Sequence, residues 1–205
     1  MAPTKGRAKG RKMQCVEGSG REAVILAGGR SSRMGRAKSG IVVDGQTILE
    51  RIGTELEGAG FLVSILGGDP IERWPQIPDS VVHSGPLAAL ADYSLQGEAL
   101  FVASCDMPLF RGAAAIAVFE ALGDAHACMP TLGGRAQPLC AAYSAGALAR
   151  AREMSAQGET RVMKWVESLD TLFLDEEDLR HRRVDPNWVR SANTLSELEA
   201  ILEDA

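Results

Sequence analysis

The sequence predicts an α/β fold: a single Rossmann-like domain with a mainly parallel, twisted sheet and helices on both faces. Short apolar segments alternate with helical stretches along the chain, which is typical of parallel strands connected by helices. The 205 residues suit one domain with a sizeable core, and 45% of them are hydrophobic, as in ordinary globular proteins. An apolar run at residues 23–27 stops abruptly at Gly28 and Gly29, as a buried parallel strand does when it meets a loop.

The elements of the first half follow from capping residues and turn signals. Thr47 and Glu50 match a capping box, which predicts a helix from residue 48 to about residue 57. Gly58 and Gly60 then end this helix. Pro86 suits the first turn of a helix that continues to about residue 95. The strands predicted in this half after the first run span residues 41–43, 61–66 and 100–104.

The second half continues the alternation. Its predicted helices span residues 113–122, 145–154 and 161–169, and a last helix runs to about residue 202. Its predicted strands span residues 127–129, 139–143 and 172–174. Thr194 and Glu197 repeat the capping-box pattern before the last helix. Residues 1–21 are expected to form a basic, disordered tail, and residues 22–205 the domain.

Composition limits the class of protein. Five of the 22 Lys and Arg residues lie in residues 1–12, which hold no acid, so the remainder carries 17 cations against 27 carboxylates. An acidic body argues against nucleic acid as the main partner. No apolar run approaches the roughly 20 residues that span a bilayer, so no membrane is expected. The four cysteines are widely spaced, which favours reduced, mostly buried thiols in a cytoplasmic protein.

Residues 26–38 carry the strongest functional signal, because three glycines and four cations share one loop. Glycines let backbone N–H groups approach a ligand, and basic side chains suit phosphates. The spacing is not that of a Walker A loop, since Arg36 and Ala37 separate the last glycine from Lys38. It is not a dinucleotide fingerprint either, since Arg30 and Arg33 stand at the second and third glycine positions. A loop that binds nothing is the simpler alternative, but such loops rarely carry four cations.

This segment, Leu-Ala-Gly-Gly-Arg-Ser-Ser-Arg-Met-Gly-Arg-Ala-Lys, closely resembles the signature loop of a superfamily of nucleotidyltransferases. Within that superfamily it is most similar to the molybdenum cofactor guanylyltransferases. The resemblance covers roughly residues 22–204 and implies a nucleotide-diphospho-sugar transferase-like fold. The nucleotide-binding residues that it implies in this loop are Leu26, Ala27, Gly28, Gly29, Arg33 and Lys38. Arg33 and Lys38 would meet the phosphates and take part in catalysis; Ala37 departs from the family pattern, where Asp is common.

Asp106 is the residue expected to bind a metal ion. It follows the apolar strand at residues 100–104, which places its carboxylate at the same sheet edge as the glycine loop. Mg²⁺ is held by few carboxylates together with phosphate oxygens, so one strand-end Asp beside a phosphate loop suits it. An Asp that caps the next helix is the alternative. The segment Cys105-Asp106-Met107-Pro108 also resembles the metal-binding segment of the family, which favours a catalytic Mg²⁺ ligand.

Four further residues are expected near the nucleotide. Asp79 precedes Gly85-Pro86-Leu87, which resembles another family block, and the matching acid in relatives lies near the nucleotide. A turn aspartate is the alternative for Asp79. Gly85 and Leu87 are expected to line the same cleft. Gly68 is included as well, although Gly67 and Gly68 fall where many guanylyl-transferring relatives carry Asn, so the base preference stays open.

The acceptor is expected to contact the C-terminal part. Arg161 lies in a segment, residues 157–162, that resembles the pterin side of the family site, where a cation could hold an anionic phosphate. A solvated residue at a helix start is the alternative. Asn193 belongs to a block that has two asparagines in the family, the first of which is replaced here by Ser191. A plain helix cap is the alternative for Asn193.

The resemblance implies an Mg²⁺-dependent guanylyltransferase that moves GMP from GTP to the phosphate of molybdopterin and releases pyrophosphate. Transient contacts with molybdoenzymes or their chaperones would follow. Related transferases that use CTP, cobinamide phosphate or a sugar phosphate remain alternatives. A non-catalytic protein that delivers the cofactor is a further alternative, against which Lys38 and Asp106 argue.

Overall fold

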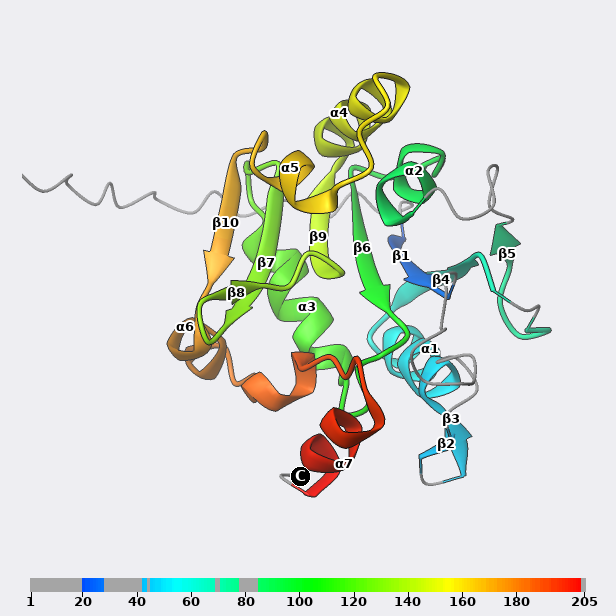
Figure 1. Cartoon of the computed structure of the whole chain (residues 1–205), viewed down its shortest axis with the longest axis vertical. Helices are drawn as coiled ribbons and strands as arrows, with labels where there is room; N and C mark the ends of the chain where they lie inside the picture. Colours follow the sequence, from blue (N-terminus) through cyan, green and yellow to red (C-terminus); the bar gives the residue numbers. More distant parts are fainter. Residues whose placement is uncertain (1–19, 28–41, 44, 69–70, 78–84, 204–205) are drawn as a thin grey trace, which may run out of the picture.

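The computed structural model describes residues 20–27, 42–43, 45–68, 71–77 and 85–203 (Figure 1). At their centre lies an eight-stranded sheet in the order β10-β7-β9-β6-β1-β4-β5, with β8 paired to β7. The strands β5, β4, β1 and β6 are parallel neighbours, whereas β9 runs antiparallel to β6 and β7. The mainly parallel α/β sheet predicted from the sequence is therefore confirmed. The bounds are β1 Arg21–Leu26, β4 Phe61–Leu66, β5 Gln76–Ile77, β6 Ala99–Ser104, β7 Ala127–Leu132, β8 Arg135–Ala136, β9 Cys140–Ser144 and β10 Thr171–Leu174.

Helices cover both faces of the sheet (Figure 1). The core on one face includes residues of α1, α3, α6, η2 and α7, and the core on the other face includes residues of α2, α4 and α5. Strand β1 contributes to both, since Ala23 and Ile25 join the first core and Val24 and Leu26 the second. The bounds are α1 Ile48–Gly58, α2 Pro86–Ala91, α3 Gly112–Ala121, α4 Ala145–Ala156, α5 Val162–Val166, α6 Glu176–His181, the 3-10 helix η2 Pro186–Val189 and α7 Leu195–Glu203.

The predicted capping box at the start of α1 is confirmed. The Glu50 N–H donates to Thr47 Oγ1 at 3.1 Å, and the Thr47 N–H donates to the Glu50 carboxylate at 2.9 Å. These bonds satisfy backbone donors that the first helical turn leaves unpaired. A small antiparallel hairpin of β2 (Val42–Val43) and β3 (Gln46–Thr47) precedes the helix.

Two helices are shorter than the sequence predicts. Helix α2 ends at Ala91 rather than near residue 95. The guanidinium of Arg152 on α4 donates to the carbonyl oxygens of Ala91 and Tyr93 at 3.0 and 2.7 Å. A side chain thus satisfies acceptors at the end of α2 without another helical turn. Helix α5 spans Val162–Val166, within the expected range of 161–169. No pattern in the sequence predicted β5, α6 or η2.

The three described cysteines, Cys105, Cys128 and Cys140, are buried. Burial raises the pKa of Cys128 to about 12, so this thiol stays protonated at neutral pH. Among the described residues, no helix is long and apolar enough to cross a bilayer.

Candidate active site

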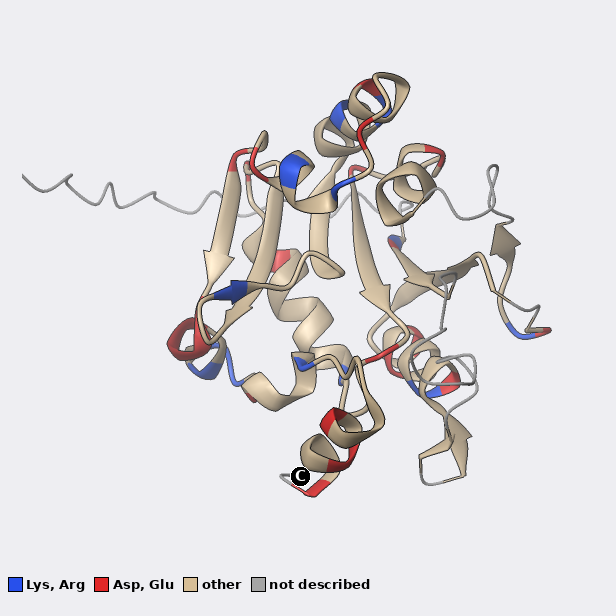
Figure 2. Ribbon diagram, in the orientation of Figure 1, with Lys and Arg blue, Asp and Glu red and all other residues tan. Residues whose placement is uncertain are grey.

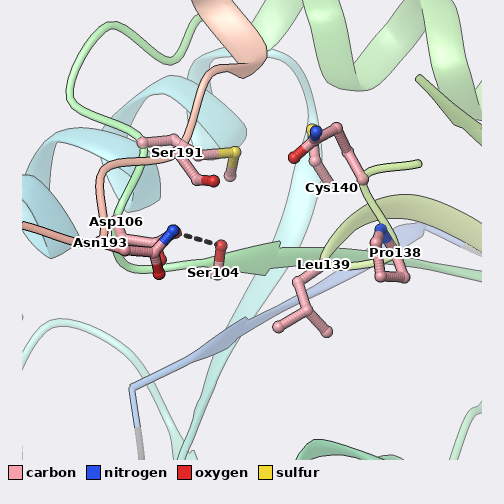
Figure 3. Close-up of a pocket in the computed structure, with 9 residues that line it drawn as sticks. Ser104, Asp106, Pro138, Leu139, Cys140, Ser191 and Asn193 are labelled. Atoms are coloured by element: carbon pink, nitrogen blue, oxygen red, sulfur yellow. Dashed lines mark hydrogen bonds between the residues drawn. The ribbon is translucent and has the colours of Figure 1, made fainter. Parts of the chain in front are cut away.

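A pocket of about 180 Å³ opens at the carboxyl end of β6 (Figure 3). Three segments line it. These are the end of β6 with Ser104, Asp106 and Met107, the turn formed by residues 137–140, and the pair Ser191 and Asn193 before α7. The antiparallel pairing of β6 with β9 sets Ala103 opposite Cys140, and this brings the 137–140 turn to the end of β6.

Asp106 lies in this pocket, at the strand end that the sequence predicts. The hydroxyl of Ser104 donates a hydrogen bond to Asp106 Oδ1 at 2.5 Å. The backbone N–H of Ala192 donates to the carbonyl oxygen of Asp106 at 2.8 Å, which ties the segment before α7 to the end of β6. Asp106 is thus held by its neighbours on two sides, while it faces a pocket.

Asn193 shares the pocket with Asp106 and lies on the same side of it as Ser104 and Ser191 (Figure 3). Thr194 supplies the side-chain cap of α7, because the Glu197 N–H donates to Thr194 Oγ1 at 3.1 Å. The Asn193 N–H donates to the Glu197 carboxylate at 2.6 Å. The structure therefore assigns the side-chain cap to Thr194 and leaves the role of the Asn193 amide in acceptor binding as a prediction.

The opposite wall of the pocket was missed from the sequence. Pro138, Leu139 and Cys140 face Asp106 and Asn193 across it (Figure 3). Pro138 and Leu139 carry no reactive group, and burial raises the pKa of the Cys140 thiol and keeps it protonated, so these residue types gave no signal of a site. Ser104 could have been found, since it stands two residues before Asp106 at the end of a predicted strand.

Three of the predicted nucleotide-side residues, Leu26, Ala27 and Gly68, lie where β1 and β4 end. The Ala27 N–H donates to the Leu66 carbonyl oxygen at 3.0 Å. Gly68 has φ +74°, and a Cβ placed on it would lie 2.8 Å from Ala27 Cβ. The Gln76 side-chain amide donates to the carbonyl oxygen of Gly68 at 2.6 Å. Ala27 and Gly68 are thus neighbours, as a shared nucleotide site requires, while Leu26 is buried in the core.

Gly85 and Arg161 belong to segments that approach each other. A Cβ placed on Gly85 would lie 4.0 Å from the carbonyl oxygen of Thr160, directly before Arg161. Leu87 was expected to line the cleft, but its side chain is fully buried in the core between α2 and the sheet, so that expectation is wrong. In this block, Gly85 thus lies near the Arg161 segment, and the Leu87 side chain lies in the core.

Arg161 is an exposed side chain at the start of α5. It makes a two-point contact with Glu159, at 2.9 Å from Nε to Oε1 and 3.0 Å from Nη2 to Oε2. Lys164 Nζ lies 2.9 Å from Glu159 Oε2. Hydrogen bonds from Arg161 and then from Lys164 hold the pKa of Glu159 well below its usual range, so the carboxylate stays charged. Two cations are therefore held around one carboxylate.

Several site residues predicted from the sequence lie outside the described residues. These are Gly28, Gly29, Arg33, Lys38 and Asp79. Their assignments stay predictions, and the structure describes only the end of β1 that leads into the glycine loop.

The donor groups around Asp106 fit a hard cation. The pocket offers a carboxylate from Asp106, a hydroxyl from Ser104 and an amide from Asn193. In the described part of the chain, no group of three or more His, Cys, Asp or Glu side chains could hold a metal by itself. Such a site suits an ion that keeps waters and takes phosphate oxygens from a substrate, as Mg²⁺ does.

The fold is that of nucleotidyltransferases. A structural likeness extends to 2-C-methyl-D-erythritol 4-phosphate cytidylyltransferase from Thermus thermophilus, with a TM-score of 0.60 and 16% identity over 88% of this chain and 97% of that one. The likeness is greater to molybdopterin-guanine dinucleotide biosynthesis protein A from Archaeoglobus fulgidus, with a TM-score of 0.73 and 20% identity over 89% of this chain and 97% of that one. At these identities, both comparisons show the fold alone.

The sequence comparisons define the family. Residues 23–172 match the MobA-like NTP transferase domain, so the chain belongs to that family. A protein from Pelotomaculum thermopropionicum named "probable molybdenum cofactor guanylyltransferase" is 30% identical over 77% of this chain and 80% of its own length. The molybdenum cofactor guanylyltransferase of Syntrophotalea carbinolica is 27% identical over 86% of this chain and 88% of its own length.

Proposed function

We propose that this protein transfers GMP from GTP to the phosphate of molybdopterin, with release of pyrophosphate. The observation that carries the proposal is the pocket shared by Asp106 and Asn193 at the end of β6, in a chain whose sequence relatives are named guanylyltransferases. An oxygen of the acceptor phosphate would attack the α-phosphorus of GTP. The bond from that phosphorus to the bridging oxygen of the β-phosphate would break, and pyrophosphate would leave with the bond electrons.

The residues of this chain would act by positioning and by charge. Arg33 and Lys38 would neutralise the triphosphate, and Arg161 would hold the acceptor phosphate. Mg²⁺, when bound by Asp106 with support from Ser104 and Asn193, would neutralise charge that develops on the phosphate oxygens. No protein nucleophile is needed, because catalysis of this kind rests on orientation and electrostatic stabilisation.

Pyrophosphate release tests the proposal directly. The purified protein is incubated with molybdopterin, Mg²⁺ and each of the four ribonucleoside triphosphates in turn, and the product is identified by mass spectrometry. We expect release with GTP and a product heavier than molybdopterin by one guanylyl group. We further propose that the reaction takes place in the cytoplasm. Release with CTP alone would show a cytidylyltransferase instead. Absence of turnover with all four would overturn the proposal and favour a cofactor-delivery protein.

The turn that follows β4 bears on the choice of GTP as the nucleotide. Gly67 and Gly68 occupy positions where many guanylyl-transferring relatives carry Asn, so base recognition here would depend on backbone groups of this turn. The Gly67 and Gly68 carbonyl oxygens both accept from the Gln76 amide, at 3.3 and 2.6 Å. Comparing GTP with ITP, which lacks the exocyclic amino group, would show whether that group is recognised.

A further inference from the structure

We propose that Tyr143 is a positioning residue that holds the 137–140 turn against the Asp106 pocket and thereby sets the fit of the phosphate-bearing acceptor. This inference rests on the proposed function for the identity of the acceptor. The turn itself is a feature of the structure. Tyr143 lies on β9, and its side chain does not line the pocket.

Hydrogen bonds to its backbone groups hold the turn. The Gln137 N–H donates to the Pro130 carbonyl oxygen at 2.9 Å, and the Cys140 N–H donates to the Gln137 carbonyl oxygen at 3.0 Å. The third bond comes from a side chain, since the Tyr143 hydroxyl donates to the Pro138 carbonyl oxygen at 2.7 Å. Proline has no N–H of its own, so this carbonyl is the backbone hydrogen-bonding group that Pro138 offers. Tyr143 thus fixes the middle of the turn.

Tyr143 is itself firmly placed. Its side chain is fully buried, and its ring stacks on Trp165 with centroids 4.5 Å apart and planes inclined by 28°. The Trp165 indole N–H donates to the Ala147 carbonyl oxygen at 3.0 Å, which fixes the partner ring. Burial raises the pKa of Tyr143, so the hydroxyl remains a donor across the physiological range. A buried hydroxyl requires a partner, and here that partner is the wall of the pocket.

The turn forms the side of the pocket that faces Asp106 and Asn193 (Figure 3). A shift of this wall would change the width of the pocket next to the proposed acceptor contact. In the sheet order, β6 separates β9 from β1, so the turn and the end of β1 lie on opposite sides of β6. Trp165 belongs to α5, which starts directly after Arg161. Tyr143 therefore connects the 137–140 turn with α5, and both belong to the proposed acceptor side. It connects no feature that the structure describes on the nucleotide side.

Tyr143→Phe removes the hydroxyl and keeps the ring, and Tyr93→Phe is a matched control. Tyr93 is also buried, and its hydroxyl donates to Glu22 Oε2 at 3.1 Å, near the start of β1 and at the other end of the strands from the pocket. Tyr143→Phe loses the hydrogen bond to a neutral carbonyl oxygen, whereas Tyr93→Phe loses its contacts with the Glu22 carboxylate and with Ser64 Oγ at 3.5 Å, so the control should show at least as large a fall in thermal midpoint. Only Tyr143→Phe removes a bond to the pocket wall.

Steady-state kinetics with varied molybdopterin and varied GTP provide the first readout. Tyr143→Phe should raise the KM for molybdopterin roughly five- to tenfold, the size expected for one hydrogen bond, with the KM for GTP changed less than about twofold. Tyr93→Phe should change neither. An equal rise in both KM values, or the same acceptor effect in Tyr93→Phe, would overturn the assignment of Tyr143.

Hydrogen exchange, followed by mass spectrometry without substrates, provides the second readout. The peptide that contains the Gln137 and Cys140 amides should exchange faster in Tyr143→Phe than in the wild type, and at the wild-type rate in Tyr93→Phe. Unchanged exchange would refute the positioning role whatever reaction the protein catalyses. If the wild-type protein fails to join GTP and molybdopterin, the proposed function fails, while this second readout still decides whether Tyr143 holds the turn.

Discussion

The hydroxyl of Ser104 lies 2.5 Å from Oδ1 of Asp106, two residues further along the chain. Ser104 is the last residue of β6, so the strand itself fixes where this hydroxyl points. The bond restricts rotation of the carboxylate and keeps it directed along one wall of the pocket. The orientation of the Asp106 carboxylate therefore depends on the end of β6, which positions the Ser104 hydroxyl.

Replacing the two partners separately distinguishes charge from orientation. Asp106→Asn should lower kcat about 100- to 1000-fold, the cost typical of a key electrostatic group. Ser104→Ala should lower kcat only about tenfold, equivalent to about 1.4 kcal/mol, because Asp106 keeps its charge and loses one orienting hydrogen bond. Both thermal midpoints should stay close to that of the wild type. Near-normal Mg²⁺-dependent turnover in Asp106→Asn would contradict the metal assignment.

Lys38→Ala should weaken binding of GTP more than binding of GMP, and leave guanosine almost unaffected. Lys38 ends the glycine loop, where its ammonium group can reach phosphates rather than the base. Arg33→Ala should act in the same direction but more mildly, since three other cations share the loop. Calorimetric titration with the three ligands measures this. Equal losses of affinity for all three ligands would mean that the loop maintains the shape of the site and that Lys38 and Arg33 do not bind the phosphates.

Gly68→Ala should destabilise the protein and weaken nucleotide binding, because the new methyl group would press on Ala27 at 2.8 Å. Gly134→Ala is the matched control, since Gly134 has φ +73° against +74° for Gly68 but nothing within 4 Å of a Cβ. The control should lose about 1 kcal/mol from backbone strain alone. Denaturant unfolding and nucleotide titration of both variants give the comparison. If Gly68→Ala lost no more stability and no more nucleotide affinity than the control, the backbone at the end of β4 would be shown to adjust to the added methyl group.

Arg183→Gly should stabilise the protein by about 0.5–1 kcal/mol. Among the described residues other than glycine, Arg183 alone has a positive φ, at 62°. It follows α6, where the Val184 N–H donates back to the Leu179 carbonyl oxygen at 2.9 Å, a position that glycine adopts without strain. Arg183 also ends a basic stretch with Arg180 and Arg182, opposite the acidic first turn of α6 (Figure 2). Chemical unfolding measures the change, and a loss of stability would mean that the guanidinium makes a stronger contribution than the strain.

The capping box of α1 should make stability depend on pH in a defined window. A backbone hydrogen bond and then a side-chain hydrogen bond from Thr47 lower the pKa of Glu50 in the folded state. The folded protein therefore binds this proton less readily than the unfolded chain, and the contribution is present above the unfolded pKa of about 4.3. It is lost as the pH falls from there through the lowered folded value. The difference in thermal midpoint between the wild type and Glu50→Gln should be positive at pH 7 and shrink below about pH 4.5. A constant difference would refute this account.

Local sequence signals predicted the parts of the fold that depend on local chemistry. The apolar runs of β1 and β4, the capping box of Thr47 and Glu50, and the strand-end place of Asp106 all follow from short segments. Strand β5 was missed because its two residues, Gln76 and Ile77, show no period and pair only with the end of β4. The 137–140 turn was missed for a different reason: its place beside Asp106 results from the pairing of β9 with β6, which no local pattern encodes.

The antiparallel strand β9 has a consequence for how such enzymes diverge. It divides the sheet into a parallel block, β6-β1-β4-β5, and a second block, β9-β7-β10, from which the 137–140 turn extends to the pocket. Substitutions in the 137–140 turn can reshape one wall of the pocket while the backbone ladder from β6 to β5 keeps its register. If this wall fits the acceptor as we propose, a lineage could change its acceptor by substitutions in one turn and leave the parallel block unaltered.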